Sequence, residues 1–110
     1  MPPRYIPAAL TTHQLVMNCV DFQDRINTLN AMWDESFDAW TGAIQRNEPQ
    51  HLIDAHQRLC KSMKRRLTLV TNRLYATKKE RLIRDLNSLR ELEQNAQKLR
   101  ATQGENAGGP

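Results

Sequence analysis

The stretch that decides the fold is residues 52–74, LIDAHQRLCKSMKRRLTLVTNRL. Its apolar side chains recur every three or four residues, which places them along one side of an α-helix. The members of this stripe are Leu52, His56, Leu59, Met63, Leu67, Val70 and Leu74. Pro49 suits the first turn of such a helix, with Asn47 or Glu48 as its cap. The pattern therefore predicts a long amphipathic helix over about 49–75.

A second apolar stripe precedes this one and has the same helical spacing. It consists of Leu15, Cys19, Phe22, Ile26, Leu29, Trp33, Phe37, Trp40 and Ile44. Thr11 and Gln14 have the spacing of a capping box, in which each side chain bonds the backbone N–H of the other residue. The sequence therefore predicts a first long helix from about residue 11 to residue 44, with a break at 46–50.

Thr77 and Glu80 repeat the capping-box spacing, so the sequence predicts a break or bend at Ala76–Thr77 and a third helix over about 78–101. The apolar side of that helix carries Leu82, Leu86, Leu89, Leu92 and Leu99. The predicted fold is all-α, with three helices in one domain over residues 11–101. Prolines predict a flexible arm at 1–10, and glycines predict a disordered tail at 102–110.

Long apolar seams in a chain of only 110 residues leave surface that three helices cannot all cover. We therefore expect a symmetric homodimer that forms a four-helix bundle, either parallel or antiparallel. The predicted interface consists of Trp33, Phe37, Trp40, His56, Leu59, Met63, Leu67 and Val70.

The composition argues against a membrane protein, a secreted disulfide scaffold and a zinc finger. No apolar run approaches the roughly 20 residues of a membrane span. The two cysteines, Cys19 and Cys60, are too few for a disulfide framework or a four-ligand zinc site. His13, His51 and His56 lack metal-ligand spacing, and no nucleophile elbow or phosphate-binding glycine loop is present. The sequence therefore predicts no enzyme, no metal and no cofactor.

Charge is distributed unevenly along the chain. Residues 1–50 hold three bases and six acids, whereas residues 51–110 hold 13 bases and six acids. Within 55–84 there are ten bases and one acid, Glu80. This asymmetry indicates an anionic partner for the second part of the chain, such as nucleic acid, an acidic membrane surface or an acidic protein.

The bases of the second helix gather opposite its apolar stripe and extend over about 30 Å at ~1.5 Å per residue. We name this set the basic face: Arg58, Lys61, Lys64, Arg65, Thr68, Asn72, Arg73 and Lys79. Hydroxyl and amide groups among the bases suit phosphate and sugar contacts. A helix-turn-helix and an aromatic platform for single strands are both missing, so the pattern favours shape-based binding of duplex RNA. The alternatives are a merely solvated face, or an adaptor or chaperone dimer that binds a partner helix.

Two clusters of residues resemble a known family. One is Asp24-Arg25-Ile26-Asn27-Thr28, and the other comprises His56, Leu59, Lys61, Val70-Thr71 and Leu74. Together they resemble the double-stranded-RNA-binding silencing suppressor of insect nodaviruses, over about residues 20–100.

This resemblance implies an all-helical homodimer that lies on duplex RNA of any sequence in the host-cell cytoplasm, with viral replication sites as one location. It implies that long duplexes are hidden from Dicer and short ones from silencing complexes, with Dicer itself a further candidate partner. Lys61 matches a family lysine that contacts RNA, whereas Arg58 stands where a smaller contact residue is expected. Thr68 stands at the position of a family arginine, whose role would pass to Arg65 or Arg73.

Overall fold

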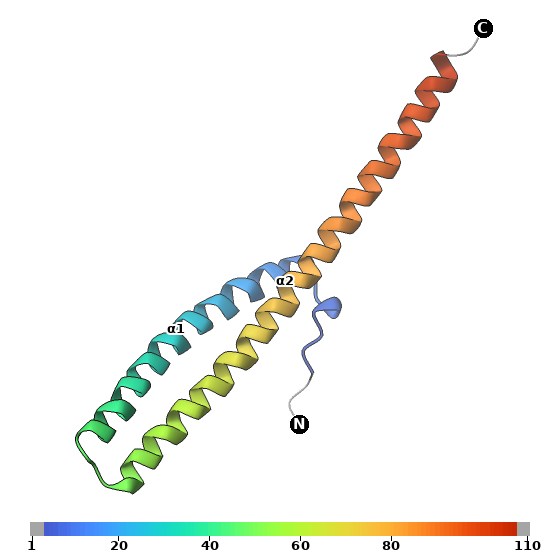
Figure 1. Ribbon diagram of the computed structural model, residues 1–110. Coiled ribbons are helices and arrows are strands. Elements are labelled where there is room, and N and C mark those ends of the chain that lie inside the picture. The colour runs from blue at the N-terminus through green and yellow to red at the C-terminus, as the bar shows by residue number, and fades with distance from the viewer. Residues whose placement is uncertain (1–3, 108–110) are drawn as a thin grey trace.

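A computed structural model describes residues 4–107, which form an elongated all-helical molecule of 94 × 30 × 16 Å (Figure 1). A short 3-10 helix, η1 (Pro7–Ala9), is followed by α1 (Thr12–Gln45) and α2 (Gln50–Ala107). The two long helices lie side by side as an antiparallel hairpin, and α2 continues well beyond the start of α1. The all-α prediction is therefore confirmed, in a molecule whose second helix is far longer than its first.

The start of α1 and the start of α2 have the features that the sequence predicted, a capping box and a proline. At the start of α1, Gln14 N donates to Thr11 Oγ1 at 3.1 Å and Thr11 N donates to Gln14 Oε1 at 2.8 Å, which confirms the capping box. At the turn, Asn47 adopts a left-handed φ of 55°, a conformation that asparagine tolerates better than most residues. The Pro49 carbonyl then accepts from the backbone N–H groups of Leu52 and Ile53 and so starts α2.

The apolar stripes of α1 and α2 face each other, and their contact forms the core. Cys19 and Phe22 on α1 pack with Val70 and Leu74 on α2, and all four side chains are buried. Further toward the turn, the buried Ser36 hydroxyl donates to Met63 Sδ at 3.5 Å. Met63 and Val70, predicted for the dimer interface, are thus covered by α1 of their own chain. Part of the apolar seam that the sequence pattern assigned to a dimer interface is thus buried within a single chain.

The predicted break at Ala76–Thr77 does not occur, and the predicted third helix is the continuation of α2. Thr77 is fully buried, and its hydroxyl donates to the Arg73 carbonyl one turn back at 2.7 Å. Tyr5 contacts the same hydroxyl at 2.5 Å, from 72 residues away in the sequence. Glu80 pairs with Arg84 instead of reaching back to a cap. Both side chains of the capping pattern are therefore satisfied inside an unbroken helix.

The segment before α1 lies against α2. The Arg84 guanidinium donates to the Leu10 carbonyl at 2.6 Å and to Thr12 Oγ1 at 3.3 Å. Tyr5 meets Phe22 edge-on, with 5.5 Å between ring centroids. Residues 4–10 of the predicted arm are thus tied to the hairpin, and residues 1–3 lie outside the described residues. At the other end, α2 extends six residues beyond the predicted helix end at 101, and residues 108–110 of the predicted tail also lie outside the described residues.

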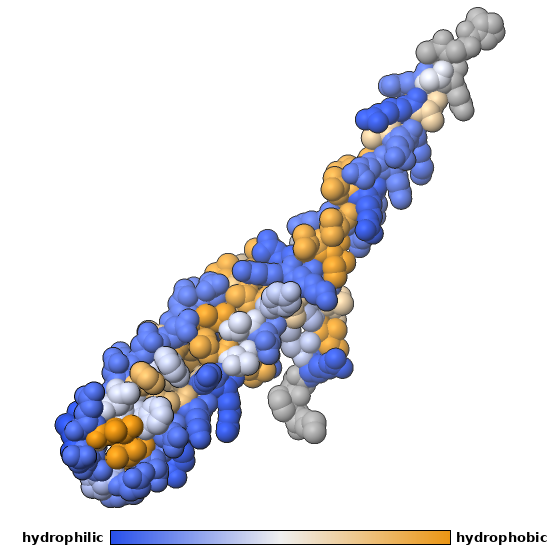
Figure 2. All heavy atoms as spheres, viewed as in Figure 1, coloured by the Kyte–Doolittle hydropathy of each residue, from blue (hydrophilic) through white to orange (hydrophobic). Residues whose placement is uncertain are grey.

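Beyond the hairpin, α2 has no neighbouring element in the described part of the chain. Figure 2 shows hydrophobic atoms gathered on this part of α2, just past the hairpin. The side chains that remain exposed there are Leu82, Ile83, Leu86, Leu89, Leu92 and Leu99. Apolar surface is therefore uncovered on the free end of α2, and also on the hairpin, where Val20, Leu59 and Leu69 are exposed.

Candidate nucleic-acid interface

The basic face lies on the side of α2 that points away from α1. All but one of its members are exposed: Arg58, Lys61, Lys64, Arg65, Thr68, Asn72 and Lys79. Lys61, Lys64, Arg65 and Thr68 line one open hollow on the surface. The structure thus brings the centre of the predicted site together on a single rigid helix.

The bases of this face are free to meet an external anion. Among the side chains that the structure describes, the ion pairs are Arg46–Glu48 at 2.9 Å and Arg84–Glu80 at 3.1 Å. Neither pair includes a member of the basic face. Because the apolar side of α2 is already covered by α1, the exposed bases are not needed to complete the hairpin. Their concentration in one place raises the local positive potential, which attracts polyanions.

Arg73 differs from the other predicted RNA contacts. Its side chain is half-buried, and its guanidinium carbon lies 6.0 Å from the centroid of the Tyr5 ring. That distance is at the outer limit of a cation–π contact. Arg73 is therefore less accessible than Arg65, which is exposed.

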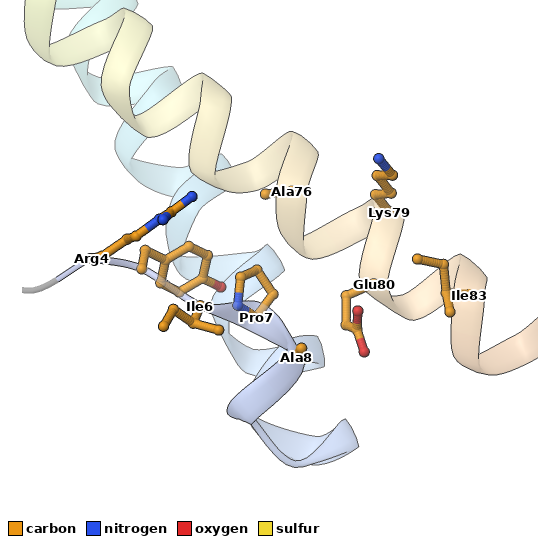
Figure 3. Close-up of a pocket in the computed structure, with 9 residues that line it drawn as sticks. Arg4, Ile6, Pro7, Ala8, Ala76, Lys79, Glu80 and Ile83 are labelled. Atoms are coloured by element: carbon orange, nitrogen blue, oxygen red, sulfur yellow. The ribbon is translucent and has the colours of Figure 1, made fainter.

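Arg4 is a candidate contact that the sequence pattern did not predict. Figure 3 shows the hollow between the N-terminal segment and α2, with Arg4 on one wall and Lys79 on the other. Both side chains are exposed. Tyr5 holds this segment on the hairpin by its contact with Thr77, so Arg4 is carried to the end of the basic face. Nothing near Arg4 in the sequence signals this position, because it depends on contacts between residues more than 70 positions apart.

The opposite helix has the opposite charge. Five acids of α1 are exposed: Asp21, Asp24, Asp34, Glu35 and Asp38. Arg25 is the single base of that helix. A polyanion would therefore be attracted to the α2 side of the hairpin and repelled from the α1 side.

An aromatic cluster lies near the turn of the hairpin, at the edge of the basic face. The Trp33 and Phe37 rings stack with 5.1 Å between centroids, and Phe37 meets Trp40 edge-on at 6.0 Å. The three rings line a hollow together with Lys61 and Lys64. Of the remaining residues predicted for the dimer interface, His56 and Leu67 are half-buried and Leu59 is exposed.

The described residues contain no cluster of three or more His, Cys, Asp or Glu side chains that could hold a metal ion. Over the same residues, no helix has both the length and the apolar composition that crossing a membrane requires. Searches against protein-family models, curated proteins and solved structures return no significant match to this chain. The geometry and charge of the hairpin are therefore the basis for a functional conclusion.

Proposed function

We propose that this protein binds double-stranded RNA without regard to sequence, through the basic face of α2. The observation that carries the proposal is the run of exposed bases outside the described ion pairs, along one side of a helix whose other side packs on α1 at Met63, Val70 and Leu74. A solvated helix surface ordinarily mixes acids with bases, whereas here no acid occurs between Asp54 and Glu80. Such a surface suits the phosphate backbone, which supplies most of sequence-independent affinity.

The shape of the face favours a duplex over a single strand. From Arg58 to Lys79 the helix is straight and unbroken, over about 32 Å at ~1.5 Å per residue. Thr68 and Asn72 place hydrogen-bonding groups among the bases, where they can reach 2′-hydroxyls across a shallow minor groove. Single strands are usually held by several exposed aromatic rings among the bases. Here the exposed ring of Tyr75 stands alone on α2, and the three-ring cluster lies at the edge of the basic face.

In the cell, we propose that the protein acts as a viral suppressor of RNA silencing. Coating of long duplexes would deny Dicer its substrate, and coating of short duplexes would prevent their loading into silencing complexes. The resemblance of residues 24–28 and of the second cluster to the nodavirus suppressors supports this role. The proposal includes a homodimer that forms a helical bundle, as the same resemblance implies.

Direct binding assays test the RNA-binding proposal. Two RNA duplexes of equal length and unrelated sequence should shift at the same protein concentration in a native gel. Single-stranded RNA and duplex DNA of that length should require at least about tenfold more protein, because they lack the A-form groove with its 2′-hydroxyls. If duplex RNA fails to shift at low salt, the basic face is not an RNA site and the adaptor alternative is favoured.

A protection assay tests the proposed role in silencing. Purified Dicer should cleave a long duplex more slowly as the protein approaches saturation of that duplex. The concentration that halves cleavage should match the concentration that half-saturates binding. Inhibition of Dicer well below that concentration would contradict sequestration of the substrate as the mechanism.

A further inference from the structure

Three large rings near the turn of the hairpin lie outside its core. The buried side chains at this end of α1 are small ones, Ser36 and Ala43. Phe37 remains 38% exposed, and Trp33 and Trp40 are half-buried beside it. Aromatic rings are the side chains with the most apolar area to bury, so packing of the hairpin does not explain why they lie outside the core.

The three rings line a hollow of about 260 Å³ that also has side chains of α2 in its lining. The Trp33 and Phe37 rings stack on each other, and Phe37 meets Trp40 edge-on. The volume is just below the roughly 300–1,000 Å³ of most small-molecule sites, so it suits a single flat ring system better than a length of peptide. We name this site the aromatic hollow: Trp33, Phe37, Trp40, Gln57, Lys61 and Lys64.

The charge of the aromatic hollow limits what can occupy it. Aromatic rings around a hollow can bind a cation. Here, however, Lys61 and Lys64 would repel a cation, and no acid of the described chain lines the hollow. A flat ring that carries a negative charge suits the site better, because the ring can stack and the charge can meet the lysines. A nucleotide is such a ligand, and its base can stack on aromatic side chains.

The aromatic hollow is continuous with the basic face. Lys61 and Lys64 line both this hollow and the open one that contains Arg65 and Thr68. The aromatic hollow lies at the end of the basic face that is nearest the turn. Bases inside a duplex are paired and stacked on one another, whereas a base beyond the last pair is free to stack on a protein ring. The position therefore suits an unpaired nucleotide at the end of a duplex on the basic face.

We propose that the aromatic hollow holds an unpaired nucleotide at the end of a bound RNA duplex, with the base on the rings and a phosphate at the lysines. The inference rests on the proposed RNA binding and extends it to duplexes with single-stranded ends. The Gln57 amide both donates and accepts, so it can bond the edge of any base. Trp33, Phe37 and Trp40, which the sequence pattern assigned to a dimer interface, would then contact RNA, and the proposed homodimer would use other surface.

The first test compares RNA duplexes of one sequence that have blunt ends, a short 3′ overhang or a short 5′ overhang. Overhangs of the same length without bases are the matched controls, because they carry the same phosphates without the rings. In a native gel, at least one intact overhang should bind about fivefold tighter or more than its baseless control, the low end of what stacking of one base contributes. Equal affinities would overturn the inference and leave the proposed duplex binding in place. Failure of every duplex to bind would overturn both.

Tryptophan fluorescence reports on the site directly, because Trp33 and Trp40 are the only tryptophans of the chain and both line the aromatic hollow. A base that stacks on an indole ring quenches its emission. At saturation, the preferred overhang duplex should therefore quench the emission more strongly than its baseless control. Equal quenching by the two duplexes would mean that no base enters the hollow.

Substitutions of Phe37 test whether the ring itself is needed. Phe37→Leu should abolish the preference for the intact overhang, because leucine fills a similar volume but has no flat face. Phe37→Tyr should retain the preference. Tyr75→Leu is the matched control and should also retain it, since it removes an exposed ring that does not line the hollow. With equal helix content by circular dichroism, a preference that survives Phe37→Leu would overturn the inference.

Two other occupants of the aromatic hollow are outcomes of the same fluorescence measurement. A second copy of the chain in the hollow would make the emission of the RNA-free protein shift on dilution through the micromolar range. An anionic membrane surface, where tryptophan and lysine also gather, would shift the emission when vesicles containing phosphatidylserine are added. The emission should respond to neither treatment. A shift in either case, without quenching by an overhang, would overturn the proposal in favour of that occupant.

Discussion

The two parts of α2 belong to one unbroken helix yet differ in almost every property of their side chains. Residues 50–79 contain eight bases and one acid, whereas residues 82–104 contain four bases and three acids. In the first part the apolar side is covered by α1, and bases occupy the opposite side. In the second part charges of both signs alternate, and leucines are exposed. The helix thus separates a charged surface from an apolar one along its length.

Neither surface is explained by the folding of a single chain. Burial of apolar area stabilises the hairpin, and exposed bases contribute nothing to that burial. Exposed leucines likewise leave apolar area in water. Burial within one chain thus accounts for neither surface, and the proposed RNA binding would account for the basic one. Substitutions in the hairpin and in the free end of α2 test this contrast, beginning with the largest expected effect.

The first prediction concerns the seam between α1 and α2. Leu74→Ala should lower the free energy of unfolding by about 2–5 kcal/mol, because the side chain is buried and its removal leaves a cavity. Leu69→Ala, on the same helix but half exposed, should cost less than about 1 kcal/mol. Urea denaturation followed by circular dichroism measures both. Equal costs for the two variants would mean that α1 does not cover α2 at Leu74.

The second prediction concerns the point where α2 leaves the hairpin. Arg84→Ala removes the bonds to Leu10 and Thr12 and the ion pair with Glu80, and should cost about 1–3 kcal/mol. Lys98→Ala, on the free end of α2, should change the stability by less than about 0.5 kcal/mol. Limited proteolysis should also cut the N-terminal segment sooner in Arg84→Ala. An unchanged cleavage rate would show that Arg84 does not hold that segment.

The helices themselves were largely predictable from the sequence. Periodicity located both seams, Thr11 and Gln14 marked the start of α1, and Pro49 marked the start of α2. The error at Thr77 has a physical cause: its hydroxyl donates to the Arg73 carbonyl within the helix and also contacts Tyr5, far away in the sequence, so it does not cap a new helix. The periodicity of apolar residues also shows that one side of a helix is buried, but it does not show which element buries that side. The pattern assigned Met63 and Val70 to a dimer interface, and in the structure both are buried against α1 of the same chain.

Residues of the candidate site that a single helix positions could be predicted from the sequence. Residues whose position depends on contact between two segments could not. The order of bases along α2 sufficed to place Lys61, Lys64 and Arg65 on one side, because helical geometry alone determines their directions. Arg73 was assigned to the same set, but its side chain is half-buried near the Tyr5 ring of the N-terminal segment. Arg4 was missed for the converse reason, since the fold of that segment places it in the same hollow as Lys79.

The smallest expected effect concerns the hydrogen bond between Tyr5 and Thr77, a residue inside the unbroken helix α2. Thr77→Val and Tyr5→Phe each remove one partner of the Tyr5–Thr77 contact and should each cost about 1 kcal/mol. The double variant should cost less than the sum of the two, because both single changes remove the same bond. Thermal or urea denaturation of all four chains gives this coupling. Fully additive costs would mean that the two hydroxyls do not interact.

The proposed function requires that the bases on the hairpin part of α2 hold the RNA. The decisive measurement is duplex-RNA affinity as a function of salt concentration. Lys61→Ala with Arg65→Ala should weaken binding at least tenfold at physiological salt. The slope of log affinity against log salt should fall by roughly one unit for each phosphate no longer neutralised, which is roughly two units per chain and four for the proposed homodimer. Lys98→Ala with Arg100→Ala removes the same charge from the free end of α2 and should leave both quantities nearly unchanged. Circular dichroism should confirm equal helix content in all three chains. Equal losses of affinity in the two double variants would show that total charge, and not the basic face, determines binding, and would contradict the account.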